Sequence, residues 1–513
     1  MILATLYFIV FCIILRKASF FKDEQLSYKF ILAILFLKIL GCAIYYWIYF
    51  KYYPGSFKND STSTMQDAMV VYNALPNHIS DYLKIIFGAH SDFSTDPLYN
   101  SYFKHIDKWG GSDSVSDYFL NDNRTSIRLH AVIMLFSFGH YAVHALVMLV
   151  LSFMGQFAFY KTYKIYFKGK EFLLAFIIFI TPSILFWTSG VLKEPLAIFL
   201  IGIFIYSYFN IFIHKNAKTK TLILFAISIF GFLILKPYIL VLLIVPLSIF
   251  TIVNKYQIKK ITLFYFISFV LLYGTGIFTL KYVLKKDIIK TIVTRQNDFV
   301  NLSKGGVFLL NETKYVRLDP EDYDCFVNVN QKHLNIGRIK PHTKLMYWDA
   351  KHINNLRDTL FDNDNKDSSL FHFHSFCPVA GSGITINKLE PTFTSFMRLI
   401  PQSFYNVLCK PFFHDSNSIT ELMASLENLF FILFGLICFI YSSKTNPFKN
   451  QLLLFSFIII SSFLLIGLTT TVMGAIVRYK VPFLPFLLMI PLLYLDIEKL
   501  KKNSIIKRFI KSN

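Results

Sequence analysis

The chain has 513 residues, of which 54% are hydrophobic and only 16% are charged, and its mean hydropathy is +0.49. This composition excludes an ordinary soluble protein. The hydrophobic residues fall in runs of about 16 to 24, which favours membrane-spanning helices and excludes a transmembrane β-barrel. The 52 Lys and Arg outnumber the 31 Asp and Glu, giving a net charge of +21. Because these cations gather in short loops between the runs, we interpret them as cytoplasmic loop charge and not as a nucleic-acid-binding surface.

The sequence predicts an all-α fold, a polytopic transmembrane helical bundle of about eleven spans with two external soluble regions. The first run ends at Arg16 and Lys17 and lacks a basic start and a small-residue cleavage site, so we expect a retained helix with its N-terminus outside. Every short basic loop then falls on the cytoplasmic side. The predicted spans are 1–15, 30–50, 141–160, 172–187, 195–213, 221–235, 238–253, 261–284, 426–441, 451–468 and 481–495.

The spans divide the chain into six predicted parts. These are two N-terminal transmembrane helices in 1–50, a first external loop in 51–128, a transmembrane helical core in 129–284, a large external region in 285–425, C-terminal transmembrane helices in 426–498 and a basic cytoplasmic tail in 499–513. The region 285–425 mixes charge, aromatic residues and turn signals, which predicts a small α+β or helical cap. Within it, His372 and His374 alternate as on one face of a strand. With the acidic residues Asp319, Glu321, Asp322 and Asp324 they are compatible with an ion site, but no ligand spacing supports a metal.

Two aspartates follow the exit of the second span, Asp60 and Asp67. Asp67, Val71 and Ala74 have helical spacing, so we expect Asp67 near the start of a short helix, where the helix dipole favours a carboxylate. The plain structural interpretation is a helix N-terminal charge at Asp67 and a turn or N-cap residue at Asp60. Tyr72 belongs to the same segment.

The turn between the fourth and fifth predicted spans combines a tryptophan, a glycine and the pair Lys193 and Glu194 before Pro195. A hairpin explains the pattern, since Gly190 allows the turn and Pro195 starts the returning helix. A lysine at this position also suits a lipid phosphate. Both interpretations stay open.

Arg478, Tyr479 and Lys480 lie in a predicted short external loop before the last span, where the positive-inside bias disfavours cations. Arg478 is suited to a bidentate phosphate contact and Lys480 to a point-charge contact. The alternative is that both reach phospholipid headgroups.

Arg124 and Arg128 end the first external loop and, four residues apart, share one helix face. They suit an anionic lipid headgroup or a substrate phosphate, or serve as interface anchors. His140 and His144 have the same spacing, but no acidic ligand accompanies them, so polar helix packing is the preferred interpretation and metal stays unassigned.

Three of these segments resemble membrane glycosyltransferases of the GT-C class and related proteins of bacterial surface-polysaccharide assembly. The resemblance rests on Asp60, Asp67, Ala68 and Tyr72, on the turn from Trp187 to Pro195, and on Arg478, Tyr479, Lys480 and Pro482. It implies an enzyme of the bacterial inner membrane that transfers a sugar from a polyprenyl-phosphate-linked donor to a glycan, lipid or protein acceptor in the periplasm. It further implies that Asp60 or Asp67 accepts the acceptor's proton or helps to hold Mg²⁺ or Mn²⁺, while the cations face the lipid phosphate. The extra leading helix departs from the usual arrangement of this class.

Other functions stay open on the sequence alone. A polysaccharide polymerase or ligase also works on polyprenyl-linked glycans. A transporter or flippase of a lipid-linked or anionic substrate would carry ionisable residues inside its spans, and Lys38 is the exception in spans otherwise nearly free of charge. A non-catalytic membrane subunit is the third alternative.

Overall fold

A computed structural model describes residues 2–52, 60–89, 96–106, 109, 121–304, seven strands between 307 and 377, 382–384, 386–416, 418–443 and 448–502. The chain forms two compact units. The first contains residues 1–276, 429–462 and 478–513, and the second contains 277–428 and 463–477. Each unit is described by itself.

The first unit is helical. In chain order its helices are α1 (Ile2–Lys17), α2 (Tyr28–Trp47), α3 (Asp60–Tyr72), α4 (Ile79–Phe87), α5 (Pro97–Ser101), α7 (Asp122–Ser137), α8 (Tyr141–Tyr163), α9 (Glu171–Ala175), α10 (Pro182–Trp187), α11 (Glu194–Tyr208), α12 (Thr219–Leu235), α13 (Pro237–Tyr256), most of α14 (Ile261–Tyr282), α20 (Leu484–Tyr494) and α21 (Ile497–Lys502). Parts of α17 (Ile419–Ile440), α18 (Lys449–Thr469) and α19 (Met473–Lys480) also belong to it.

Eight helical segments in the described part of the chain are long and apolar enough to cross a membrane. They are Tyr28–Tyr52, Tyr141–Tyr166, Glu194–Ile213, Pro237–Tyr256, Ile261–Tyr282, Ile419–Ile440, Lys449–Thr469 and Met473–Tyr494. Two shorter apolar helical segments, Glu171–Ile180 and Thr219–Leu235, accompany them. The prediction of a helical membrane protein is therefore confirmed.

Within the first unit, α8 and α11 cross with their backbones in close contact. Gly155 and Gly202 meet there, and a Cβ atom added to Gly202 would lie 1.8 Å from the carbonyl oxygen of Gly155. Small residues allow helix backbones to approach this closely in membranes. The contact fixes α11, which carries site residues at its N-terminus.

A small helical cluster, α3 to α7, follows α2. Ala68 and Val71 of α3 pack against Ile127, Ala131 and Met134 of α7 and form a buried core with residues of α4 and α5. At the end of α7 the chain turns through Phe138 and Gly139, both with positive φ (51° and 76°), and enters α8 at Tyr141. The predicted start of this span at Tyr141 is thus confirmed as the start of a helix.

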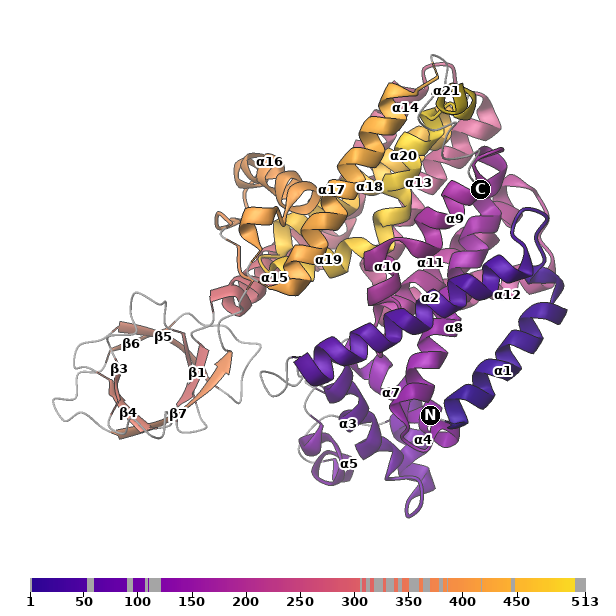
Figure 1. Ribbon diagram of the computed structural model, residues 1–513. Coiled ribbons are helices and arrows are strands. Elements are labelled where there is room, and N and C mark those ends of the chain that lie inside the picture. Colours follow the sequence, from indigo (N-terminus) through magenta and orange to yellow (C-terminus); the bar gives the residue numbers. More distant parts are fainter. Residues whose placement is uncertain are drawn as a thin grey trace. The chain divides into compact units, whose positions relative to one another are not determined.

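The second unit contains α15 (Ile288–Lys304), α16 (Phe393–Cys409) and an antiparallel sheet. Its strands are β1 (Val307–Leu310), β2 (Lys314–Arg317), β3 (Phe326–Asn328), β4 (Ile336–Ile339), β5 (Lys344–Asp349), β6 (Thr359–Asp362) and β7 (Leu370–Cys377), in the order β3-β4-β7-β1-β2-β5-β6. The sheet curves around on itself in Figure 1. His372 and His374 lie on β7, as the alternating pattern predicts. The acidic residues between 319 and 324 lie outside the described residues.

One predicted loop is a helix. Residues Met473–Lys480 form α19, which continues through a 3-10 turn at Val481–Phe483 into α20. Hydropathy alone placed a loop here because Arg478 and Lys480 interrupt the apolar run. Both side chains are largely enclosed by the protein and so avoid lipid. The free-energy cost of placing a cation in lipid, which limited the predicted span to 481–495, therefore does not apply.

Candidate functional site

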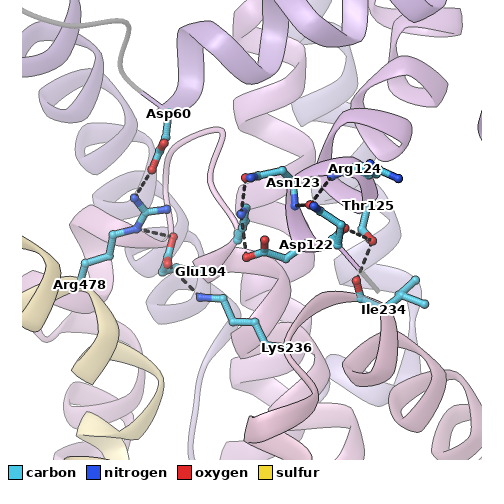
Figure 2. Close-up of polar contacts among 11 residues, drawn as sticks. Asp60, Asp122, Asn123, Arg124, Thr125, Glu194, Ile234, Lys236 and Arg478 are labelled. Carbon is cyan, nitrogen blue, oxygen red and sulfur yellow. Dashed lines mark hydrogen bonds and ion pairs between the residues drawn. The ribbon is translucent and has the colours of Figure 1, made fainter. Parts of the chain in front are cut away.

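Ionisable side chains from separate segments of the first unit meet beside α11 (Figure 2). Arg478 of α19 contacts both Asp60, at the start of α3, and Glu194, at the start of α11. The Arg478 Nε to Glu194 Oε2 distance is 2.9 Å. Lys236, between α12 and α13, lies 3.3 Å from the other Glu194 oxygen. We name Asp60, Arg478, Glu194 and Lys236 the ion network.

Exposure changes sharply along the ion network. The Asp60 side chain is 50% exposed, that of Arg478 is 16% exposed and that of Glu194 is completely buried. The network therefore leads from the protein surface to a buried carboxylate. Burial of this kind is stable only when the charges are paired.

A second contact joins α7 to the same turn (Figure 2). Lys193 donates to the Asn123 side-chain oxygen at 2.6 Å and forms an ion pair with Asp122 at 2.7 Å. Thr125, in the same helical turn, donates to the carbonyl oxygen of Ile234 at 2.7 Å. The first turn of α7 thereby holds both Lys193 and the end of α12.

Local sequence explains why the turn before α11 takes this shape. A Cβ atom at Gly190 would lie 2.8 Å from the ring of Tyr45, so only glycine allows the turn to approach α2 so closely. Pro195 occupies the first turn of α11, where a missing amide hydrogen is harmless. Glu194 lies at the same helix N-terminus, where the helix dipole stabilises a carboxylate.

Aromatic rings contact the cations of the site, and burial shifts the pKa values of its lysines. The Arg478 guanidinium carbon lies 5.7 Å from the centre of the Trp187 ring, and Lys236 Nζ lies 5.3 Å from that of Tyr479. Burial lowers the pKa of Lys193, while Asp122 acts in the opposite direction. Burial also works against the charge of Lys236, but Tyr238 and Glu194 hold its pKa above that of an ordinary lysine.

The structure brings Asp60, Lys193, Glu194, Arg478 and Tyr479 of the predicted site residues to one place. Lys480, next to them in α19, is 2% exposed and faces the protein interior. Lys236 is not among the predicted site residues and lies between the predicted spans 221–235 and 238–253. Its isolated position between two apolar runs was the available signal, since a cation there needs a partner.

The other predicted aspartate lies elsewhere on α3. Asp67 is only 2% exposed, next to the buried core that Ala68 and Val71 form with α7. Tyr72 is partly buried and packs against the same core. The roles predicted for Asp67 and Tyr72 stay predictions, and of the two aspartates Asp60 is the one that reaches the surface.

Arg124 and Arg128 stack on one tryptophan. Their guanidinium carbons lie 5.2 and 5.3 Å from the centre of the Trp109 ring. Arg124 Nε donates to the carbonyl oxygen of Trp109 and Arg128 Nε to that of Ile85, both at 2.8 Å. Because both side chains are buried, their placement favours holding the small helical cluster together over contact with a headgroup. The predicted phosphate contact stays a prediction.

A buried histidine pair lies at the turn from α7 to α8. His130 Nδ1 and His144 Nδ1 are 2.9 Å apart, and His144 Nε2 is 2.7 Å from the Ser137 hydroxyl. Burial and the neighbouring His144 lower the pKa of His130 to about 3. The predicted packing role of His144 is thus accompanied by a partner, His130, that helix spacing from His140 did not suggest.

Lys38 of α2 is fully enclosed. Its Nζ donates to the Thr188 hydroxyl at 2.8 Å and to the Ser152 hydroxyl at 3.1 Å. Thr188 lies in the turn that leads to Lys193. Lys38 therefore joins α2 and α8 to the segment that carries the site.

Among the described residues no group of three His, Cys, Asp or Glu side chains lies close enough together to hold a metal ion. The exposed carboxylate of the network, Asp60, faces a guanidinium instead. The described residues do not fit the divalent cation that the resemblance implies. No protein-family model, curated protein or solved structure matches the chain.

Proposed function

We propose that the protein is an integral-membrane glycosyltransferase that transfers a sugar from a polyprenyl-phosphate-linked donor to a cell-envelope glycan, lipid or protein acceptor. One observation carries the proposal. The three segments that resemble the GT-C class are remote in sequence, and Arg478 of one contacts Asp60 and Glu194 of the other two. Polar groups of different segments that converge at one place in a membrane protein favour a functional site.

The proposed chemistry is displacement at the sugar's anomeric carbon. The acceptor hydroxyl forms the new bond, the bond from the anomeric carbon to the phosphate oxygen breaks, and its electron pair leaves with the phosphate. Asp60 accepts the hydroxyl proton because it is the carboxylate of the network that reaches the surface. Arg478, with Lys193 near it, stabilises the leaving phosphate. Glu194, whose other oxygen Lys236 contacts, holds Arg478 in place.

The proposed topology extends the eight long apolar segments to about eleven spans. The additional spans are α1, the segment from α9 to α10, and α12. In this arrangement the ion network faces the periplasm, in a bacterial inner membrane, and 51–128 and 285–425 are the external regions. The lysines at 161, 164 and 170 then face the cytoplasm, in agreement with the positive-inside rule.

The test compares surface glycans of cells that carry the wild type, Asp60→Asn, Asp67→Asn or Arg478→Ala. We expect Asp60→Asn to reduce transfer by at least about 100-fold, as for loss of a general base, and to accumulate the lipid-linked precursor. Asp81→Asn is the matched control, because Asp81 is a partly exposed aspartate of α4 whose partners are Ser80 and Tyr102. Membrane abundance of each variant is measured in parallel.

Different glycan outcomes separate the alternatives. Loss of one sugar supports a transferase, whereas an altered chain length with unchanged composition supports a polymerase or ligase. Unchanged glycans in all three variants at normal abundance would contradict the proposal and favour transport or a non-catalytic subunit. For transport, the residue to test is Lys38, the enclosed cation of α2.

A further inference from the structure

The buried part of the ion network carries one excess positive charge. Arg478 and Lys236 are both cations, and Glu194, which is fully buried, supplies the one negative charge between them. A buried excess charge is strongly unfavourable. A second anion is therefore required at Arg478, and Asp60 supplies it in this structure.

The two carboxylates on Arg478 differ in their exposure to solvent. Glu194 is enclosed and also contacts Lys236, so it has no route to the surface. Asp60 lies at the first residue of α3 with half of its side chain exposed. Of the two anions, Asp60 is the one that can be exchanged for an anion from outside.

Arg478 has partners other than Asp60. Its Nε lies 2.9 Å from Glu194, and its guanidinium lies over the Trp187 ring. The Nε–H makes no hydrogen bond to Glu194, so charge and stacking hold the guanidinium on this side. A guanidinium group binds two phosphate oxygens at once through two of its N–H groups. Asp60 contacts Arg478 through a single carboxylate oxygen, at Nη1.

We propose that Asp60 covers an anion-binding position on Arg478 and that the phosphate group of the lipid-linked donor displaces it. This inference rests on the proposed function and adds an order of events to it. Before the donor binds, Asp60 is occupied by Arg478. When the donor phosphate takes its place, the Asp60 carboxylate is released beside the phosphate and becomes available to the acceptor hydroxyl. The base is thus available only when a donor is present.

The experiment measures binding of farnesyl phosphate, a short prenyl phosphate, to the purified full-length protein in detergent. Removing the competing carboxylate in Asp60→Asn is expected to tighten binding about tenfold. Asp60→Glu, which keeps the charge, is expected to bind like the wild type. Asp81→Asn is the matched control and is expected to change nothing. Arg478→Gln is expected to lose binding, and its folding is checked by its unfolding temperature.

Competitors identify the source of the phosphate. Farnesol is expected not to compete, because it lacks the phosphate. Competition by inorganic phosphate supports a position that binds the phosphate group itself. If phosphatidylglycerol in nanodiscs removes the gain of Asp60→Asn, the occupant is an ordinary bilayer lipid and the donor assignment is overturned. Unchanged or weaker binding by Asp60→Asn overturns the displacement.

The binding experiment and the glycan test can each fail without the other. Loss of transfer by Asp60→Asn without tighter binding keeps the transferase and overturns the displacement. Tighter binding without any change in glycans keeps the covered phosphate position, overturns its role in releasing a base, and contradicts the transferase. The two readouts therefore distinguish the inference from the function on which it rests.

Discussion

At one end of the first unit, lysines donate to backbone carbonyl groups, whereas at the opposite end cations pair with carboxylates. Lys161 donates to the carbonyl oxygen of Phe20 at 2.5 Å, and Lys170 to that of Leu492, near the end of α20, at 2.9 Å. Cations at helix C-termini satisfy free carbonyl groups and the helix dipole. In the ion network, Arg478 and Lys236 instead share Glu194.

The comparison shows that basic residues at the ends of apolar runs serve two purposes. A lysine on a helix end completes the backbone hydrogen bonds of its neighbour and has a fixed partner. In the network, Arg478 has a half-exposed carboxylate, Asp60, as one of its partners, and we propose that this carboxylate is exchanged. Lys164 also pairs with a carboxylate at the first end, Asp23, at 2.6 Å, so an ion pair alone does not distinguish the two ends. What distinguishes the ion network is one buried carboxylate, Glu194, that two cations share.

The largest effect is expected from Glu194→Gln, which removes the charge that Arg478 and Lys236 share. Leaving buried cations without their carboxylate is expected to lower the unfolding free energy by about 3–5 kcal/mol. Thermal unfolding of the purified protein measures this change, with Glu171→Gln in α9 as the matched control. If the double variant Glu194→Gln with Lys236→Gln is no more stable than Glu194→Gln alone, the charge explanation fails.

The next largest effect is expected at the buried, uncharged histidine pair of His130 and His144, which makes the unfolding free energy depend on pH. His130 is neutral in the fold because its pKa is about 3, but in the unfolded chain it has its usual value near 6.5. The unfolded state therefore binds more protons between these values, so stability is full above about pH 6.5 and falls as pH decreases towards 3. The expected loss is up to about 1.4 kcal/mol for each pH unit. Unfolding temperatures between pH 7.5 and 5 measure it, and His130→Asn should flatten the profile.

Lys170→Met tests the end that uses backbone carbonyl groups. Losing the donor to Leu492 and Leu493 is expected to lower the unfolding free energy by about 1 kcal/mol, a typical value for one hydrogen bond. Glycan transfer is expected to stay unchanged, because Lys170 has no part in the ion network. A loss of transfer at normal abundance would show that the two ends are not functionally distinct.

The smallest effect is expected from Lys501→Ala in α21. Its contact with Glu498 is 3.4 Å long and both side chains are mostly exposed. Such pairs contribute about 0.3–0.5 kcal/mol or less. An unfolding temperature within error of the wild type would confirm that charge alone stabilises little at this end.

Much of the helical part of the fold follows from hydropathy. The predicted starts at Tyr141 and Ile261 coincide with the starts of α8 and α14, because a span needs a long apolar run and such runs are visible in sequence. The helix at Met473–Lys480 was not predicted, since Arg478 and Lys480 made the segment resemble a loop. The charge of Arg478 is balanced by Asp60 and Glu194, and a hydropathy window does not include such distant partners.

The candidate site was predictable in its parts and not in its connections. Asp60, Glu194 and Arg478 were each predicted as site residues because they are charges beside apolar runs. Their mutual contacts depend on how segments up to 418 residues apart pack together. Lys236 was overlooked for the same reason, because its partner Glu194 is 42 residues away and the intervening helices hide the relation.

The crossing of α8 and α11 sets a limit on which substitutions the protein tolerates. Even a methyl group at residue 202 would overlap the Gly155 carbonyl oxygen, and both of the groups in conflict are backbone or attached directly to it. Gly274 has open space around its Cβ position. In a saturation library selected for membrane abundance, position 274 should accept alanine freely, whereas position 202 should return only the glycine codons.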